Sequence, residues 1–126
     1  MKIMIVEKDL EFREHLALRL ESAGLTVSES GNLQEAEKLA RKSNSELDCV
    51  VLGLSGFGRS SLEFMENIST AVPELKVVLI NRHNKIPLSI EAMNLGACAE
   101  ISVPVDIAAL AKTLHRCCSG CADKEH

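Results

Sequence analysis

The sequence contains no tryptophan and no tyrosine, and aromatic side chains make up only 2% of its 126 residues. Proteins that bind single-stranded nucleic acid usually stack the bases on aromatic side chains, so this composition argues against such a function. It also argues against a flavin site, in which an aromatic ring would stack on the cofactor. The formal net charge of −4 is the wrong sign for a surface that binds nucleic acid.

Long hydrophobic runs are also missing: none approaches the roughly 20 residues of a membrane-spanning helix. The chain opens directly on strand-like sequence, without the pattern of a signal peptide. We therefore expect a cytoplasmic protein without a membrane partner, whose five cysteines are reduced thiols. Hydrophobic residues make up 46% of the chain, which is enough for one domain with one core.

The apolar run from Cys49 to Leu52 predicts a central strand that is buried on both faces. Five strand-like segments alternate with five helical ones. The strands are expected at about 2–6, 25–29, 49–52, 76–80 and 99–102, and the helices at about 10–23, 32–42, 60–68, 87–95 and from 106 onward. This alternation predicts an α/β fold, a five-stranded parallel sheet of order 2-1-3-4-5 with helices on both faces.

Local signals set some of the expected helix ends. Asn32 and Glu35 have the spacing of a capping box, Gly24 is placed to end the first helix, and Asp106 can cap the last one. The domain is expected to span residues 1–116, and a polar, cysteine-containing tail is expected over 117–126.

Parallel topology brings the carboxyl ends of the strands to one edge, where α/β proteins bind ligands. The residues expected at that edge are Glu7, Lys8, Gly53, Asn81, Val103 and Pro104.

Several stretches resemble the receiver domains of bacterial two-component response regulators. Residues 3–9 (IMIVEKD) resemble the acidic opening of these domains, and 48–58 resembles their phosphorylation strand and loop. Residues 90–97 (IEAMNLGA) are similar to their fourth helix and the turn after it, and 104–106 matches the opening of the fifth helix. The resemblance covers about residues 2–114 and implies the receiver fold and a role in signal transduction.

The resemblance also implies a site from which this sequence departs. In the family, two acids hold Mg²⁺, a third acid accepts the phosphoryl group, and a Ser or Thr and a Lys contact that group. Here Glu7 keeps the first acid, and the other positions hold Lys8, Gly53, Asn81 and Val103. We therefore expect a degenerate receiver that binds no cofactor. Two alternatives stay open for Lys8, which either supplies the missing positive charge or points to solvent, and Asn81 is expected to hydrogen-bond loop backbone.

The leading hypothesis is a stand-alone protein without enzyme activity that acts through phosphorylation-independent protein binding. Its partners would be signalling proteins such as a histidine kinase or a separate output protein, and a homodimer is a further alternative. Family partners use the face made by the fourth helix, fifth strand and fifth helix. The candidate contacts on that face, expected to be exposed, are Lys85, Ser89, Glu100 and Lys112.

The resemblance leaves the end of the chain unexplained. His115, Cys118, Cys121 and His126 offer the ligand types of a zinc site, which suggests a thiol- or metal-responsive sensor as the alternative function. However, the C-x-x-C pair follows a helix carboxyl end, where the helix dipole opposes a thiolate. We therefore favour a silent tail, and we expect Cys49 and Cys98 to be small buried apolar residues.

Overall fold

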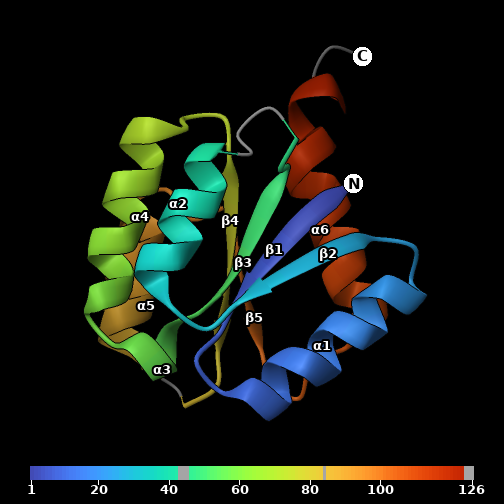
Figure 1. Ribbon diagram of the computed structural model, residues 1–126, viewed down its shortest axis with the longest axis horizontal. Helices are drawn as coiled ribbons and strands as arrows, with labels where there is room; N and C mark the ends of the chain where they lie inside the picture. The colour runs from blue at the N-terminus through green and yellow to red at the C-terminus, as the bar shows by residue number, and fades with distance from the viewer. Residues whose placement is uncertain (43–45, 84, 124–126) are drawn as a thin grey trace.

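A parallel sheet forms the centre of the computed structural model, which describes residues 1–42, 46–83 and 85–123, the last five of these by backbone only. The strand order is β2-β1-β3-β4-β5, as the sequence predicted (Figure 1). The strands are β1 (Lys2–Val6), β2 (Thr26–Ser30), β3 (Cys49–Gly53), β4 (Lys76–Asn81) and β5 (Ala99–Ser102). All five residues of β3 are buried, because β3 lies between two strands and beneath helices on both faces.

Helices cover both faces of the sheet and so divide the core into two layers (Figure 1). One face carries α2 (Leu33–Lys42), α4 (Ser60–Ala71) and α5 (Ile86–Asn94), and the other carries α1 (Leu10–Ser22) and α6 (Ile107–Asp123). A short helix, α3 (Leu54–Phe57), follows β3 directly where the sequence predicted only a loop.

Polar side chains and one glycine set the helix ends. Asn32 Oδ1 accepts a hydrogen bond from the Glu35 amide at 2.9 Å, and Asp106 Oδ1 accepts one from the Ala109 amide at 3.1 Å. Both caps were predicted, but the Glu35 carboxylate accepts from the Ser30 hydroxyl rather than completing a capping box. Gly24 follows α1 with a φ of 95°, a conformation that glycine adopts without strain.

The prediction that a polar tail begins at Cys117 is wrong. The helix α6 continues to Asp123, and Cys117 is only 6% exposed and packs in the same core layer as Leu110 and Leu114. The residues from 117 to 123 therefore extend the last helix rather than leave the domain. None of the described helices, α6 included, has the length and apolarity needed to span a membrane.

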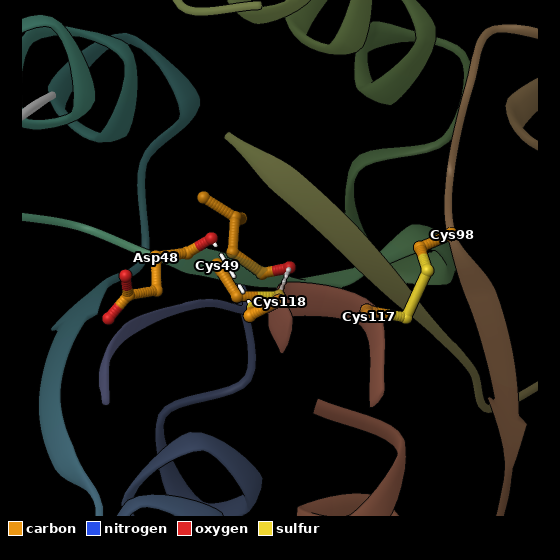
Figure 2. Close-up of a disulfide and its surroundings, with 6 residues drawn as sticks. Asp48, Cys49, Cys98, Cys117 and Cys118 are labelled. Carbon is orange, nitrogen blue, oxygen red and sulfur yellow. Dashed lines mark hydrogen bonds between the residues drawn. A yellow bond between two sulfur atoms is a disulfide. The ribbon is translucent and has the colours of Figure 1, made fainter. Parts of the chain in front are cut away.

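The expectation of five reduced thiols is also wrong. Cys98 and Cys117 form a disulfide that joins the segment before β5 to α6, with 6.2 Å between their Cα atoms (Figure 2). Cys98 is exposed, whereas Cys49 is fully buried as predicted. A disulfide with this sequence separation of 19 residues restricts the unfolded chain and is expected to stabilise the fold by about 3 kcal/mol.

This disulfide gives a first prediction. Cys98→Ser should lower the free energy of unfolding by about 3 kcal/mol, because the unfolded chain regains the freedom of the opened loop. Urea unfolding measures the loss, with the wild-type protein in reductant as the matched control. The reduced wild type should match the variant, and reductant should not affect the variant further. Equal stability of the oxidised wild type and the variant would contradict the prediction.

Candidate functional site

The carboxyl ends of the central strands meet around a buried carboxylate, that of Glu7. This residue follows β1 and is only 3% exposed. Its Oε2 accepts a hydrogen bond from the Asp9 amide at 2.8 Å. Burial of an ionised carboxylate is costly unless charge and hydrogen bonds compensate it, so the neighbours of Glu7 decide what this edge can do.

The nearest cation to that carboxylate is Arg82, the first residue after β4. Its Nη1 lies 3.9 Å from Glu7 Oε2 and 3.2 Å from Asp9 Oδ2. The guanidinium also lies over the Phe12 ring, 4.2 Å from its centroid, in a cation–π arrangement. Arg82 is half-buried, so part of its charge is shielded from water. It thus bridges two carboxylates and is fixed in place by an aromatic ring.

Lys8 does not supply this charge. Its side chain is exposed and forms no ion pair with a described residue, so of the two alternatives the solvent-facing one holds. Sequence analysis missed Arg82, although its place directly after Asn81 at a strand end was a usable signal. Arg82 was hard to recognise because side-chain direction in that loop depends on tertiary packing.

Gly53 ends β3 and lies against the Glu7 carboxylate. A Cβ atom at Gly53 would overlap Glu7 Oε1 and come within 2.9 Å of Cδ. The space beside the end of β3 is therefore filled by Glu7, and the absence of a side chain at position 53 makes that packing possible. Gly56 has a similar role, since a Cβ there would lie 2.9 Å from Lys8 Cβ.

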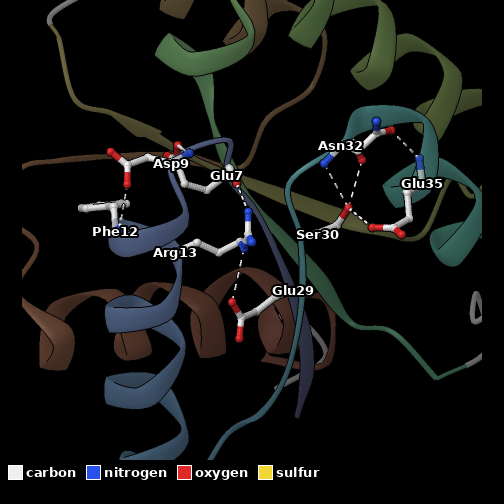
Figure 3. A network of polar contacts seen from close by, with 8 residues as sticks. All are labelled: Glu7, Asp9, Phe12, Arg13, Glu29, Ser30, Asn32 and Glu35. Atoms are coloured by element: carbon white, nitrogen blue, oxygen red, sulfur yellow. Dashed lines mark hydrogen bonds and ion pairs between the residues drawn. The ribbon is translucent and has the colours of Figure 1, made fainter.

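A second arginine fixes the backbone at the end of β1 (Figure 3). Arg13 on α1 donates from Nη1 to the Glu7 carbonyl at 2.7 Å, and its Nε lies 3.3 Å from Glu29 Oε1 on β2. The guanidinium lies directly against Gly31, where a Cβ would overlap it. This contact holds α1, β1 and β2 together at the edge where Glu7 lies.

Asn81 connects the ends of β4 and β5. Its Oδ1 accepts from the Lys85 amide at 3.0 Å, which confirms the predicted hydrogen bond to loop backbone. Its Nδ2 donates to Glu100 Oε2 at 3.0 Å, a contact that sequence analysis did not foresee. Val103 and Pro104, joined by a cis peptide bond, follow β5 nearby in sequence, and Val103 is half-buried.

Asp9 has a double role at this edge. It caps α1 through a 3.0 Å hydrogen bond from the Phe12 amide to Oδ1, and it pairs with Arg82 through Oδ2. The Phe12 amide first, and then the Arg82 guanidinium, hold the pKa of the Asp9 carboxyl below its usual range. Asp9 therefore remains ionised at neutral pH and balances the charge of Arg82.

Three of the four residues predicted on the partner face have the expected exposure. Lys85, Glu100 and Lys112 are exposed, but Ser89 is only 5% exposed. The prediction for Ser89 is wrong because this residue lies on the buried side of α5. The same helix exposes three large apolar side chains that sequence analysis did not single out: Ile86, Ile90 and Met93.

The candidate zinc ligands near the chain end are not brought together as far as the structure describes them. His115 is exposed on α6, while the Cys118 thiol donates to the Asp48 carbonyl at 3.5 Å. The side chains of Cys121 and His126 lie outside the described residues. Among the residues that are described, no three His, Cys, Asp or Glu side chains form a group suited to a metal ion.

Comparison with known families assigns the chain. A family model described as the response regulator receiver domain matches residues 3–115. The chain belongs to the response regulator receiver domain family. The sheet order and the layers of helices agree with this assignment, and so does the resemblance that the sequence itself shows.

Two relatives that match this chain are transcriptional regulatory proteins. The transcriptional regulatory protein FixJ of Azorhizobium caulinodans is 31% identical over 108 residues, which make up 86% of this chain and 50% of that protein. The C4-dicarboxylate transport transcriptional regulatory protein DctD of Rhizobium meliloti is 28% identical over 81% of this chain and 22% of that protein. This receiver domain thus spans half or less of these two relatives.

A solved receiver domain protein from Clostridium thermocellum has the same fold. Its TM-score is 0.88 with 18% identity, over 96% of each chain. At this level of identity the likeness concerns the fold alone.

The Mg²⁺ that the family implies does not fit the residues of this edge. Octahedral Mg²⁺ needs oxygen ligands with room for bound water. Here Glu7 is engaged by the Asp9 amide and lies beside Arg82, and Asp9 is paired with the same arginine. A divalent cation would have to displace that guanidinium, and Gly53 and Lys8 bring no carboxylate in its place.

The packing of Glu7 against Gly53 gives a second prediction. Gly53→Ala should lower the free energy of unfolding by about 1–3 kcal/mol, since the added methyl group overpacks a buried carboxylate. In a Glu7→Ala background the same substitution should cost less, because the atoms it would meet are gone. A double-mutant cycle measured by urea unfolding gives the coupling, expected at about 1 kcal/mol or more. Equal costs in both backgrounds would show that the two residues do not compete for space.

The charge of Arg82 gives a third prediction. Arg82→Ala should lower the free energy of unfolding by about 2 kcal/mol at pH 7, because Glu7 then stays buried without its nearest cation. Lys8→Ala is the matched control and should change stability by less than about 0.5 kcal/mol, because Lys8 is exposed. A larger loss of stability for Lys8→Ala than for Arg82→Ala would show that Lys8, and not Arg82, supplies the positive charge beside Glu7.

The pH dependence of the Arg82→Ala effect tests the role of Asp9. The pKa of Asp9 is lowered in the folded protein from an ordinary value of 3.8. A carboxyl group whose pKa is lower in the folded than in the unfolded protein stabilises the fold at pH values above its unfolded-state pKa. This stability is lost as the pH falls through its folded-state pKa. The difference between wild type and variant should therefore shrink as the pH falls below about 4. Unfolding curves at several pH values measure it.

Proposed function

We propose that this receiver domain is a degenerate one that signals through phosphorylation-independent protein–protein interaction. The observation that supports this most directly is the packing of the Glu7 carboxylate beside Gly53. In the family, an acid at the end of the third strand accepts the phosphoryl group beside a metal ion. Here that position has no side chain, and the space next to it is filled.

The remaining nucleophile in the loop is a poor substitute. Ser55 follows Gly53 by two residues on α3, and its buried Oγ has no hydrogen-bond partner among the described residues. A serine hydroxyl needs an adjacent base before it can act as a nucleophile. Because no described residue is hydrogen-bonded to Ser55 Oγ as a base, and Arg82 already pairs with Glu7 and Asp9, phosphoryl transfer to Ser55 is not part of the proposed function.

The contacts that would relay a signal are also held in one arrangement. Asn81 is bonded at once to Glu100 and to the Lys85 amide, and it ties β4 to β5 and to the loop before α5. Arg82 supplies a permanent positive charge beside Glu7. A switch needs two states that differ in their contacts with the ligand. The described contacts of Asn81 and Arg82 support one such state, and we infer a single conformation that is competent to bind a partner.

The surface formed by α5, β5 and α6 is the proposed binding face. Exposed charges at Lys85, Glu100 and Lys112 accompany the apolar side chains of Ile86, Ile90 and Met93. Apolar side chains with charged neighbours are typical of protein-binding surfaces. The partner would be another signalling protein, such as a histidine kinase or an output protein, or a second copy of this chain.

Phosphorylation chemistry gives the fourth prediction. Acetyl phosphate with Mg²⁺ should leave the intact mass of the protein unchanged, because the end of β3 offers no carboxylate. Gly53→Asp should not restore transfer, since the new carboxylate would meet Glu7 and Arg82 rather than a metal ion. A receiver domain that retains the acid, treated in parallel, is the positive control. A phosphoryl adduct on the native chain would overturn the proposal.

The binding face is tested separately. Glu100→Lys with Lys112→Glu should weaken capture of the native signalling partner, whereas Lys38→Glu at an exposed position of α2, outside this face, should not. Beryllofluoride should leave the affinity of the wild-type domain unchanged. A several-fold change on adding beryllofluoride would indicate a working phosphorylation switch.

A further inference from the structure

Four cysteines gather at the amino edge of the sheet, opposite the edge that holds Glu7. Cys49 begins β3, Cys98 directly precedes β5, and Cys117 and Cys118 lie on α6 where it passes that edge (Figure 2). The proposed function uses none of them. Their chemistry can therefore be tested independently of it.

The disulfide between Cys98 and Cys117 fixes the position of the next residue, Cys118. The Cys118 thiol donates to the Asp48 carbonyl at 3.5 Å, and Asp48 is the residue directly before Cys49. The Cys49 thiol lies 3.6 Å from the Val50 carbonyl on the same strand, and its side chain lies beside that of Cys118 (Figure 2). The fold thus places one thiol of α6 against one thiol of β3.

The two thiols differ in exposure and in acidity. Cys49 is fully buried, whereas Cys118 is only half-buried. The hydrogen bond from Cys49 lowers the pKa of Cys118, with smaller help from Lys76 and the amino terminus, against desolvation and the charge of Asp48. The same contact, together with burial, raises the pKa of Cys49. Thiolates are the reactive form, so Cys118 is the first to react.

We propose that Cys118 and Cys49 form a redox-active dithiol that is oxidised to a second disulfide by a small-molecule disulfide such as glutathione disulfide. The Cys118 thiolate attacks one sulfur of glutathione disulfide, which forms a mixed disulfide and releases one glutathione thiolate. The Cys49 thiol then gives its proton to the released glutathione thiolate, and its sulfur attacks Cys118 Sγ, so that the second glutathione leaves as a thiolate. In total two protein thiols are oxidised and one glutathione disulfide is reduced.

Cys49 is the only described thiol placed to complete this reaction. The adjacent Cys117 is already bonded to Cys98, and neighbouring residues of a helix do not face one another. A disulfide between Cys117 and Cys118 would also require the helix to unwind. By contrast, Cys118 Sγ already lies 3.5 Å from the carbonyl oxygen of Asp48, the residue joined to Cys49, so α6 brings the Cys118 thiol to the start of β3. The new bond would tie α6 to β3 as well as to the segment before β5.

The fifth prediction tests this site in a Cys121→Ser background, which removes the remaining cysteine of the chain. The folded protein is treated with glutathione disulfide, quenched in acid and alkylated. The intact mass should lie two hydrogen atoms below that of the untreated, unalkylated protein, because no free thiol remains to be alkylated, and peptide mapping should find Cys49 bonded to Cys118 beside the original Cys98–Cys117 bond. Glutathione should appear on the protein only transiently.

Two variants separate the roles of the thiols. With Cys49→Ala, which keeps a small apolar side chain, Cys118 should retain one glutathionyl group and no second disulfide should form. With Cys118→Ser, the folded protein should not react, because Cys49 is buried. Circular dichroism confirms that each variant folds. Cys118 bonded to Cys117 or Cys98, equal reactivity of the Cys118→Ser variant, or no oxidation of the folded parent protein would each overturn the proposal.

Discussion

The arrangement of the carboxyl edge depends on one constraint, the burial of an ionisable carboxylate at Glu7. A carboxylate that is 3% exposed needs both a hydrogen-bond donor and a positive charge nearby. The donor is the Asp9 amide, whose residue also caps α1, and the charge is Arg82 at the end of β4. The contacts that compensate the buried Glu7 carboxylate thus link β1, α1 and β4. Because Glu7 and Asp9 both lie beside Arg82, this pair of carboxylates is not free to bind a divalent cation.

The glycines of this edge belong to the same arrangement. Gly31 leaves room for the Arg13 guanidinium, Gly53 for the Glu7 carboxylate, and Gly56 for the Cβ of Lys8. In each case a Cβ atom would come within 3 Å of the neighbouring side chain. The absence of a side chain at Gly53 therefore has a structural consequence beyond the loss of a nucleophile. Restoring an acid there would require Glu7 and its partners to move together.

Sequence patterns were sufficient for the strands and the helix caps, because apolar runs and capping residues act locally, and the sheet order followed from the alternation of strands with helices. They were not sufficient for Arg82, whose direction depends on how the loop after β4 packs on Phe12. The extension of α6 left a usable signal, since Leu110, Leu114 and Cys117 have the i, i+4, i+7 spacing of a buried helix face. The pairing of Cys98 with Cys117 could not be derived, because five cysteines allow many pairings.

The two ends of β3 therefore differ in the kind of change they allow. Under the proposed function, the charges and hydrogen bonds around Gly53 keep one arrangement, so that a ligand has no second one to select. At Cys49 two covalent states are chemically accessible, and they differ in how α6 is tied to the sheet. The helix α6 also carries Lys112, which belongs to the proposed binding face. Regulation of partner binding in this domain would therefore act through the position of α6, since that helix is the element whose restraints differ between the two states.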